Sequence, residues 1–192
     1  MKKIVALLGS PRTGSNSALI AERIIASASA LGATSETFAL YKLNYSGCVA
    51  CMGCKKSSDE CVLRDDLTHA LRAIREADIL ILATPVYFGQ ITGPMKCAID
   101  RMYSFVPPEY LTGGSKTRLA PGKHCVFITT QGAPDPAAFA DLTAIYEMFF
   151  GPGWFGFETH VLRGLGLSAP GAAAENAALM QQAEELGKQL MA

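Results

Sequence analysis

The sequence has no excess of charge of either sign and no long apolar run. Its 17 basic residues balance 17 acidic ones in a chain of 192, so no strongly basic surface for nucleic acid or acidic lipid is expected. No apolar stretch approaches the roughly 20 residues that span a bilayer. The short apolar run after Met1 leads into Ser10-Pro11-Arg12 rather than into small neutral residues of a cleavage site. We therefore expect a cytoplasmic protein that binds neither nucleic acid nor membrane.

Several catalytic motifs are missing as well. The segment Gly9–Ser17 has neither the Gly-Lys-Ser/Thr ending of a Walker loop nor the Gly-x-Gly-x-x-Gly of a dinucleotide fingerprint. It contains no acidic residue, which a receiver domain needs, and no cysteine, which a phosphatase of related topology would use. The three histidines, His69, His124 and His160, do not converge in the sequence. No catalytic side chain is assigned.

Apolar runs and helical patterns alternate along the chain. Hydrophobic residues make up 49% and charged residues 18%, which is typical of a compact domain, and residues 1–192 are expected to form a single one. Strands are expected at Lys3–Gly9, Thr34–Leu40, Asp78–Val86, His124–Gly132 and Phe157–Leu165. A helical pattern follows each strand. This alternation indicates an α/β fold with a parallel sheet covered on both sides.

The expected helices have recognisable starts and stops. The first begins at Ser15 or Asn16 and stops at Gly32, the second is capped by Asp65 or Asp66, the third has Pro94 in its first turn, the fourth opens at Asp135-Pro136, and the last carries Leu179 to Leu190. Leu31 in the first helix and Phe139 and Phe149 in the fourth are expected on apolar faces. The second strand is weakly apolar and suits an edge, as in the flavodoxin-like three-layer sandwich with strand order 2-1-3-4-5.

The segment after the first strand suits a phosphate group. It lies where a parallel sheet binds ligands, and the start of the following helix offers free N–H groups and a partial positive charge. Short donors, a flexible glycine and a fixed cation stand together there, namely Ser10, Arg12, Gly14, Ser15, Asn16 and Ser17. A terminal phosphomonoester such as that of FMN fits this set best. A plain serine-capped helix is the alternative for any single serine.

The segment after the third strand suits a flat aromatic ligand. It supplies a rigid proline, two aromatic rings and a glycine within one turn, namely Pro85, Val86, Tyr87, Phe88 and Gly89. A flavin requires an apolar slot with backbone donors near its polar edge. The alternative is that Tyr87 and Phe88 pack against a helix.

Four of the six cysteines are crowded into a short segment. Cys48, Cys51 and Cys54 are separated by two residues each, and Cys61 follows after six more. Two-residue spacing folds thiolates around one centre, as in bacterial-type ferredoxin loops, and Lys55 and Lys56 would offset their charge. These cysteines are candidate ligands of a 4Fe–4S cluster. Free thiols, a zinc ion and a disulfide are the alternatives.

The segments Gly9–Asn16, Gly47–Leu67 and Ala83–Arg101 together resemble the NAD(P)H-dependent FMN reductases of the flavodoxin-like superfamily, in the branch of the iron–sulfur flavoproteins. The resemblance runs from about Lys3 to Thr130. It implies that the first loop holds the FMN phosphate and that Pro85–Gly89 runs along the isoalloxazine edge. It further implies that Thr130, Gln131 and Gly132 close the other side.

The resemblance also implies an activity. NAD(P)H would reduce FMN, and the electrons would pass to a small acceptor such as a quinone or a flavin. An iron–sulfur flavoprotein that carries electrons from ferredoxin is the alternative, and a scaffold protein without turnover is a third reading. A homodimer or homotetramer is expected, with the aromatic segment Met148–Phe157 at a subunit contact or in the core. In the long loop Phe105–Lys123, the basic residues Lys116, Arg118 and Lys123 are candidates for recognising the nicotinamide nucleotide.

Overall fold

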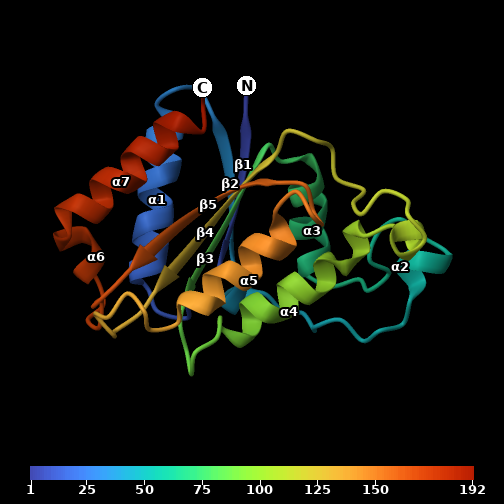
Figure 1. The fold of residues 1–192 in the computed structure, drawn as a ribbon, viewed down its shortest axis with the longest axis horizontal. Helices are drawn as coiled ribbons and strands as arrows, with labels where there is room; N and C mark the ends of the chain where they lie inside the picture. Colours follow the sequence, from blue (N-terminus) through green and yellow to red (C-terminus); the bar gives the residue numbers. More distant parts are fainter.

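The structure is a computed structural model that describes all residues from Met1 to Ala192. Five parallel strands form one sheet in the order β2-β1-β3-β4-β5, seen near the centre of Figure 1. The strands are β1 (Lys3–Leu8), β2 (Thr34–Ala39), β3 (Ile79–Pro85), β4 (His124–Thr130) and β5 (Glu158–Gly164). The expected fold class and strand order are confirmed, with the weakly apolar β2 at an edge.

Helices cover both faces of this sheet (Figure 1). They are α1 (Asn16–Ser29), α2 (Gly53–Lys56), α3 (Leu67–Glu76), α4 (Gly93–Arg101), α5 (Ala140–Phe150), α6 (Ala172–Glu175) and α7 (Ala177–Gln189). Three short 3₁₀ segments complete the chain, η1 (Leu40–Lys42), η2 (Met102–Phe105) and η3 (Pro108–Leu111). The helices α1 and α7 lie on one face, and α3, α4 and α5 lie on the other. None of the helices is long and apolar enough to cross a membrane.

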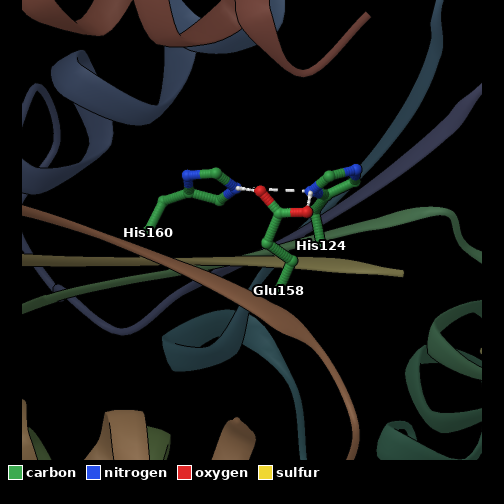
Figure 2. Close-up of side chains that lie close together, drawn as sticks. All are labelled: His124, Glu158 and His160. Carbon is green, nitrogen blue, oxygen red and sulfur yellow. Dashed lines mark hydrogen bonds and ion pairs between the residues drawn. The ribbon is translucent and has the colours of Figure 1, made fainter. Parts of the chain in front are cut away.

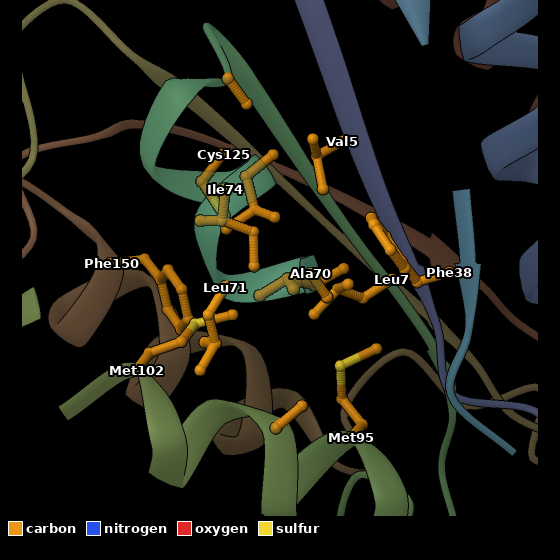
Figure 3. Packing of buried hydrophobic residues seen from close by; sticks show 14 of the residues in the cluster. Val5, Leu7, Phe38, Ala70, Leu71, Ile74, Met95, Met102, Cys125 and Phe150 are labelled. Carbon is orange, nitrogen blue, oxygen red and sulfur yellow. The ribbon is translucent and has the colours of Figure 1, made fainter. Parts of the chain in front are cut away.

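The sheet separates two hydrophobic cores. Successive residues of a strand point to opposite faces, so Ile4 and Ala6 of β1 pack against α1 and α7, whereas Val5 and Leu7 pack on the α3 side. Figure 3 shows part of this second core, in which Val5 and Leu7 of β1 belong to one cluster with Ala70 and Ile74 of α3. Burial on both faces explains why the central strands read as continuous apolar runs rather than alternating ones.

The helix starts follow the expected chemistry. The Ser15 side chain caps α1 by accepting a hydrogen bond from the Ala18 N–H over 3.3 Å. Pro94 lies in the first turn of α4, where its missing N–H costs nothing. Both expected aspartates contribute to the start of α3. Asp66 occupies the N-cap position, and Asp65 Oδ1 accepts a hydrogen bond from the Leu67 N–H over 3.2 Å.

The expected start of the fourth helix is wrong. The helix α5 begins at Ala140, because Phe139 has a φ of +60° and interrupts the right-handed helical path. Side chains hold the turn before it: Gln131 donates to the carbonyls of Asp135 and Ala138, and Arg163 donates to that of Pro136. The next two expectations are also wrong. Phe139 is not helical but has φ +60° and is 42% exposed, and Phe149 is 39% exposed while its neighbour Phe150 is buried.

The end of the first helix also differs from the expectation. The helix α1 ends at Ser29, and Leu31 lies in the turn that follows, where it is 56% exposed. The carbonyls of Ala28 and Ser29 accept from the N–H groups of Leu31 and Gly32, which closes the helix before Leu31 reaches the apolar face.

Candidate functional site

A cavity of about 270 Å³ opens at the carboxyl-terminal edge of the sheet. Segments that follow β1, β3, β4 and β5 contribute its walls. Thirteen residues line it: Ser10, Arg12, Ser15, Asn16, Pro85, Val86, Tyr87, Thr130, Gln131, Gly132, Leu167, Ser168 and Pro170. The fold therefore brings together ten of the fourteen residues expected to bind a cofactor. Gly14, Ser17, Phe88 and Gly89 lie outside this lining.

The start of α1 offers unused hydrogen-bond donors. The backbone N–H groups of Ser15, Asn16 and Ser17 have no acceptor in the protein. The Ser17 hydroxyl is buried and also lacks a partner. A helix start concentrates such donors with a partial positive charge. An anion bound here would satisfy them, so this end of the cavity fits a phosphate group.

Arg12 adds a full charge at the same end. Its backbone N–H donates to Ser10 Oγ over 3.3 Å, which closes a local turn in this loop. Its side chain lines the cavity, is exposed and forms no ion pair with any carboxylate of the protein. The guanidinium is therefore available to a ligand.

The Asn16 side chain holds the wall of the cavity. Its amide nitrogen donates to the carbonyls of Leu167 and Ala169 over 3.2 and 2.9 Å, and its oxygen accepts from the Ala173 N–H over 3.0 Å. All of its side-chain hydrogen bonds go to the segment that follows β5 and to the first turn of α6. Asn16 therefore faces a ligand with its backbone N–H, and its side chain fixes a distant loop.

The segment after β3 forms a tight hairpin turn. Tyr87 and Gln90 exchange two backbone hydrogen bonds of 2.8 and 3.0 Å. The two residues between them have positive φ, +49° at Phe88 and +75° at Gly89. A bulky side chain is strained in this conformation, and Phe88 is fully exposed. The turn thus presents an aromatic ring and two free N–H groups beside the cavity.

The segment after β4 is rigid. The Gln131 side chain is buried and donates to three carbonyls of the following loop. Gly132 faces Ser168 so closely that an added Cβ would lie 2.9 Å from Ser168 Oγ. Thr130 is buried, and its carbonyl accepts from the Val86 N–H over 2.8 Å. This wall is thereby tied to the β3 turn.

Three lining residues escaped the sequence analysis. Leu167, Ser168 and Pro170 follow β5, in a stretch without a recognisable motif. The position of these residues is itself a signal in the sequence. They follow the predicted strand Phe157–Leu165, and loops at the carboxyl ends of parallel strands gather at one edge of the sheet.

The cysteine segment surrounds a second, smaller cavity. Cys48, Cys51, Cys54 and Cys61 all line this cavity of about 20 Å³, whose walls are mainly apolar. All six cysteines are free thiols. The four side chains therefore share one location, as expected for candidate ligands. A single zinc ion would draw thiolates to within about 4 Å of one another, whereas no three of these sulfurs meet that closely.

Basic side chains hold the cysteine segment. Arg101 of α4 is buried, and its Nε donates to Cys61 Sγ over 2.9 Å while its Nη1 donates to Asp65 over 2.7 Å. Arg118 donates to the Cys54 carbonyl over 3.0 Å. Lys55 binds backbone carbonyls and lies 3.8 Å from the centre of the Tyr103 ring. Three cations thus lie beside the thiols, of which sequence had indicated only Lys55.

Burial and pairing shift the pKa values in this region. Burial opposes ionisation of Asp65, but the hydrogen bond and charge of Arg101 outweigh it and lower the pKa of the Asp65 carboxyl. Burial lowers the pKa of Lys55. The hydrogen bond with Tyr110, together with burial, raises the pKa of Tyr103 to about 12. The Asp65–Arg101 pair is therefore ionised throughout the neutral range.

The long loop does not place its basic residues at the 270 Å³ cavity. The Arg118 side chain is used by the carbonyls of Cys54, Asp59 and Ser104. Lys123 is buried at the opposite edge of the sheet and donates to the Ala77 carbonyl. Lys116 lies 5.9 Å from the centre of the Trp154 ring. None of the three lines the cavity.

The histidines also lie away from the cavity. His69 pairs with Glu36 on the surface at 2.6 Å. His124 and His160, which are far apart in the sequence, are neighbours at the amino-terminal edge of the sheet.

Comparison with known proteins gives a family match over most of the chain. The model of the family described as NADPH-dependent FMN reductase matches residues 2–147. An iron–sulfur flavoprotein of Archaeoglobus fulgidus is 36% identical over 106 residues, covering 54% of this chain and 46% of the relative. An iron–sulfur flavoprotein of Methanocaldococcus jannaschii is 31% identical over 99 residues, covering 52% of this chain and 51% of the relative. The chain thus spans about half the length of the curated relatives it matches.

Solved structures share the fold over the whole chain. An FMN-dependent NADH-azoreductase of Bacillus anthracis in complex with FMN has a TM-score of 0.72 at 18% identity, with complete coverage of both chains. An NAD(P)H:quinone oxidoreductase of Methanothermobacter marburgensis has a TM-score of 0.71 at 17% identity, covering 100% of this chain and 98% of that one. At this level of identity the similarity supports the fold alone.

Proposed function

This chain belongs to the NADPH-dependent FMN reductase family, and on that premise we propose that it is an FMN-dependent oxidoreductase. It takes hydride from NAD(P)H and passes the electrons to a small acceptor. The observation that carries the proposal is the helix start at the cavity, where three successive N–H groups and a free guanidinium await an anion. This donor set matches the charge and hydrogen-bonding capacity of a terminal phosphate.

Residues in and beside the cavity position and shield the cofactor. Ser15 to Ser17 and Arg12 hold its phosphate. Pro85 and Tyr87 border its ring, and the Phe88 and Gly89 N–H groups, which have no acceptor in the protein, face its polar edge. FMN, when bound, accepts a hydride and releases electrons to a second substrate. The protein then has to orient both partners on the ring, and no acidic or basic side chain is required for that.

The acceptor is a small molecule such as a quinone or a free flavin. The turn at Phe88 supports this, because it places a fully exposed aromatic ring beside the cavity, where a flat acceptor can approach from the solvent. Relatives of the same fold are named as quinone and azo reductases, which places such acceptors among the first to assay.

The anaerobic absorption spectrum of the purified protein tests this function. We expect the oxidised flavin bands, bleached by NADH or NADPH and restored by a quinone. Bound flavin that neither nucleotide bleaches would contradict the reductase and favour a scaffold protein. Failure to bind FMN at all would contradict the proposed cofactor site.

A second candidate function is an electron carrier with both FMN and a 4Fe–4S cluster, fed by ferredoxin. Its support is the convergence of Cys48, Cys51, Cys54 and Cys61 on one cavity beside three cations. The donor set fits a cluster, whose thiolate charge the cations would offset. Because the cavity has only about the volume of a water molecule, the exposed Cys48–Met52 segment must move outward to admit it.

Iron and sulfide analysis of anaerobically prepared protein separates the two candidates. Four irons and four sulfides per chain, after reconstitution, are expected for the electron carrier. If iron and sulfide are absent and NAD(P)H fully reduces the flavin, the electron carrier is excluded and the reductase is the candidate that stands.

We further propose a homodimer or homotetramer in the cytoplasm. An apolar groove of about 520 Å³ between α4 and α5, lined by Ile145, Phe149 and Trp154 among others, supports the self-association. Six free cysteines suit a reducing compartment. Sedimentation of the purified protein tests the oligomeric state.

A further inference from the structure

Three potential metal ligands meet at the amino-terminal edge of the sheet, far from the cavity. His124 begins β4, and Glu158 and His160 are the first and third residues of the neighbouring β5. Figure 2 shows the two imidazole rings and the carboxylate directed toward one another. His124 Nδ1 lies 3.3 Å from His160 Nε2, and the Glu158 oxygens lie 3.7 Å from His124 Nδ1 and 3.8 Å from His160 Nε2.

The strand register creates this arrangement. His124 is paired with Glu158, and Val126 is paired with His160. Alternate residues of a strand share a face, so all three side chains lie on the face covered by α1 and α7, where Val126 is buried. The ligands therefore stand on a hydrogen-bonded ladder, which fixes their spacing better than a loop would.

The distances match those of a single bound ion. Donor atoms about 2.0–2.1 Å from a tetrahedral ion lie about 3.4 Å apart. The three donors are all within 4.8 Å of one another, and this is the one group of histidine, cysteine and carboxylate side chains in the protein that meets that limit. Two imidazoles with one carboxylate form a donor set of zinc and related divalent ions.

The two rings are largely buried, whereas the carboxylate is exposed to the solvent. The His124 and His160 side chains are 20% and 14% exposed, so their rings are held in place, while Glu158 is 67% exposed. The alternative to a metal site is a single N–H···N hydrogen bond between the two rings. It would account for the 3.3 Å distance, but it would not account for the carboxylate that lies within 4 Å of both rings.

We propose that His124, Glu158 and His160 bind a single divalent transition-metal ion of the zinc type. The ion ties the edge strand β5 to β4, and water completes its coordination. The site lies six residues along each strand from Thr130 and Gly164, which is about 20 Å from the cavity. The ion therefore serves the fold rather than the electron path, and the proposal is independent of the proposed oxidoreductase activity.

The small number of histidines permits a direct test. The chain has only three, so spectra of protein labelled with ¹⁵N-histidine contain the two ligands and one internal control. Adding one equivalent of Zn²⁺ to metal-free protein is expected to shift the ring nitrogens of His124 and His160 and to leave His69 unchanged. Zinc bound only by cysteines would leave all three rings unchanged and would overturn the proposal, as would an equal response of His69.

Carboxylate variants supply a second measurement. Glu158→Gln is expected to weaken zinc binding by at least about tenfold, and its exposed position means that folding is not at stake. The matched control is Glu36→Gln, which removes the carboxylate from the other histidine–glutamate pair and is expected to leave zinc affinity unchanged. Zinc is also expected to raise the Tm of the wild type but not of His160→Gln. Equal affinities of the wild type and Glu158→Gln would contradict the site.

Discussion

Arg101 and Cys61, forty residues apart in the sequence, are joined by a hydrogen bond of 2.9 Å from the arginine Nε to the cysteine Sγ. The same guanidinium donates to Asp65 and to the carbonyls of Ser46 and Leu63. One buried side chain of α4 therefore fixes both ends of the cysteine segment. Its charge also lies beside the Cys61 thiol, so the same group supports the fold and sets the electrostatics of a candidate cluster ligand.

Replacing Arg101 with methionine is expected to lower the free energy of unfolding by about 3–5 kcal/mol, because it leaves the Asp65 carboxylate partly buried without its partner. Urea denaturation measures this change. Lys96→Met on the same helix is the control, since its ion pair with Asp100 is exposed on both sides and is worth only about 0.5 kcal/mol. Similar losses in the two variants would contradict the role given to Arg101.

The Asp65–Arg101 pair also predicts a pH dependence. The pKa of Asp65 is lowered in the folded state from its ordinary 3.8, so ionised Asp65 stabilises the fold above about pH 4 and this stabilisation is lost as the pH falls through the folded value. The free energies of unfolding of wild type and Asp65→Asn are expected to differ most at neutral pH and to converge in acid. A constant difference from about pH 7 to pH 2 would show that Asp65 acts without its charge.

Arg12→Ala is expected to weaken FMN binding by about ten- to a hundredfold, the value of a hydrogen bond to a charged group. Its effect on stability is expected to be small, because the side chain has no partner in the protein. Riboflavin, which lacks the phosphate, should bind wild type and variant equally. Fluorescence titration with both ligands checks this. Arg23→Ala, in the helix α1 that follows the loop, serves as the control. An equal loss of affinity for riboflavin and for FMN would show that Arg12 does not bind the phosphate.

Asn16→Ala removes three hydrogen bonds between the start of α1 and the segment that follows β5. It is expected to lower the free energy of unfolding by about 2–4 kcal/mol and also to weaken FMN binding, because Leu167 and Ser168 lose their support. Asn176→Ala, which removes one helix-capping bond of α7, is expected to cost about 1 kcal/mol without affecting FMN. Denaturation and FMN titration of both variants separate positioning from simple destabilisation.

The fold followed from local patterns. The continuous apolar runs of β1 and β3 predict strands that are buried on both faces. The weakly apolar sequence of β2 predicts a strand at the edge of the sheet. The start of α3 at Asp65-Asp66 and the start of α4 at Pro94 depend on neighbouring residues alone. For the same reason the clustering of the loops after β1, β3 and β4 was predictable, since parallel strands bring their carboxyl ends to one edge.

Long-range side-chain contacts were not predictable in this way. Nothing near Asn16 indicates that its amide binds residues some 150 positions later, and nothing near Arg101 indicates Cys61. The predicted start of α5 was wrong because Phe139 interrupts the helical path with a positive φ, in a turn that Arg163 of β5 holds from 25 or more residues away. His124 and His160 are adjacent only because of the register between β4 and β5. Periodicity in the sequence locates each strand to within a few residues, but it does not determine how two strands are paired.

Phe88 combines full exposure with a positive φ, a combination that costs stability and therefore points to a role outside folding. Phe88→Gly is expected to raise the free energy of unfolding by up to about 1 kcal/mol, because glycine tolerates this conformation, and yet to lower kcat/KM with NAD(P)H, because the ring beside the cavity is lost. Ala50→Gly is the control, since Ala50 is also exposed with φ +53° but lies in the cysteine segment rather than beside the 270 Å³ cavity. A Phe88→Gly variant that keeps full turnover would mean that the strained ring serves neither cofactor nor substrate.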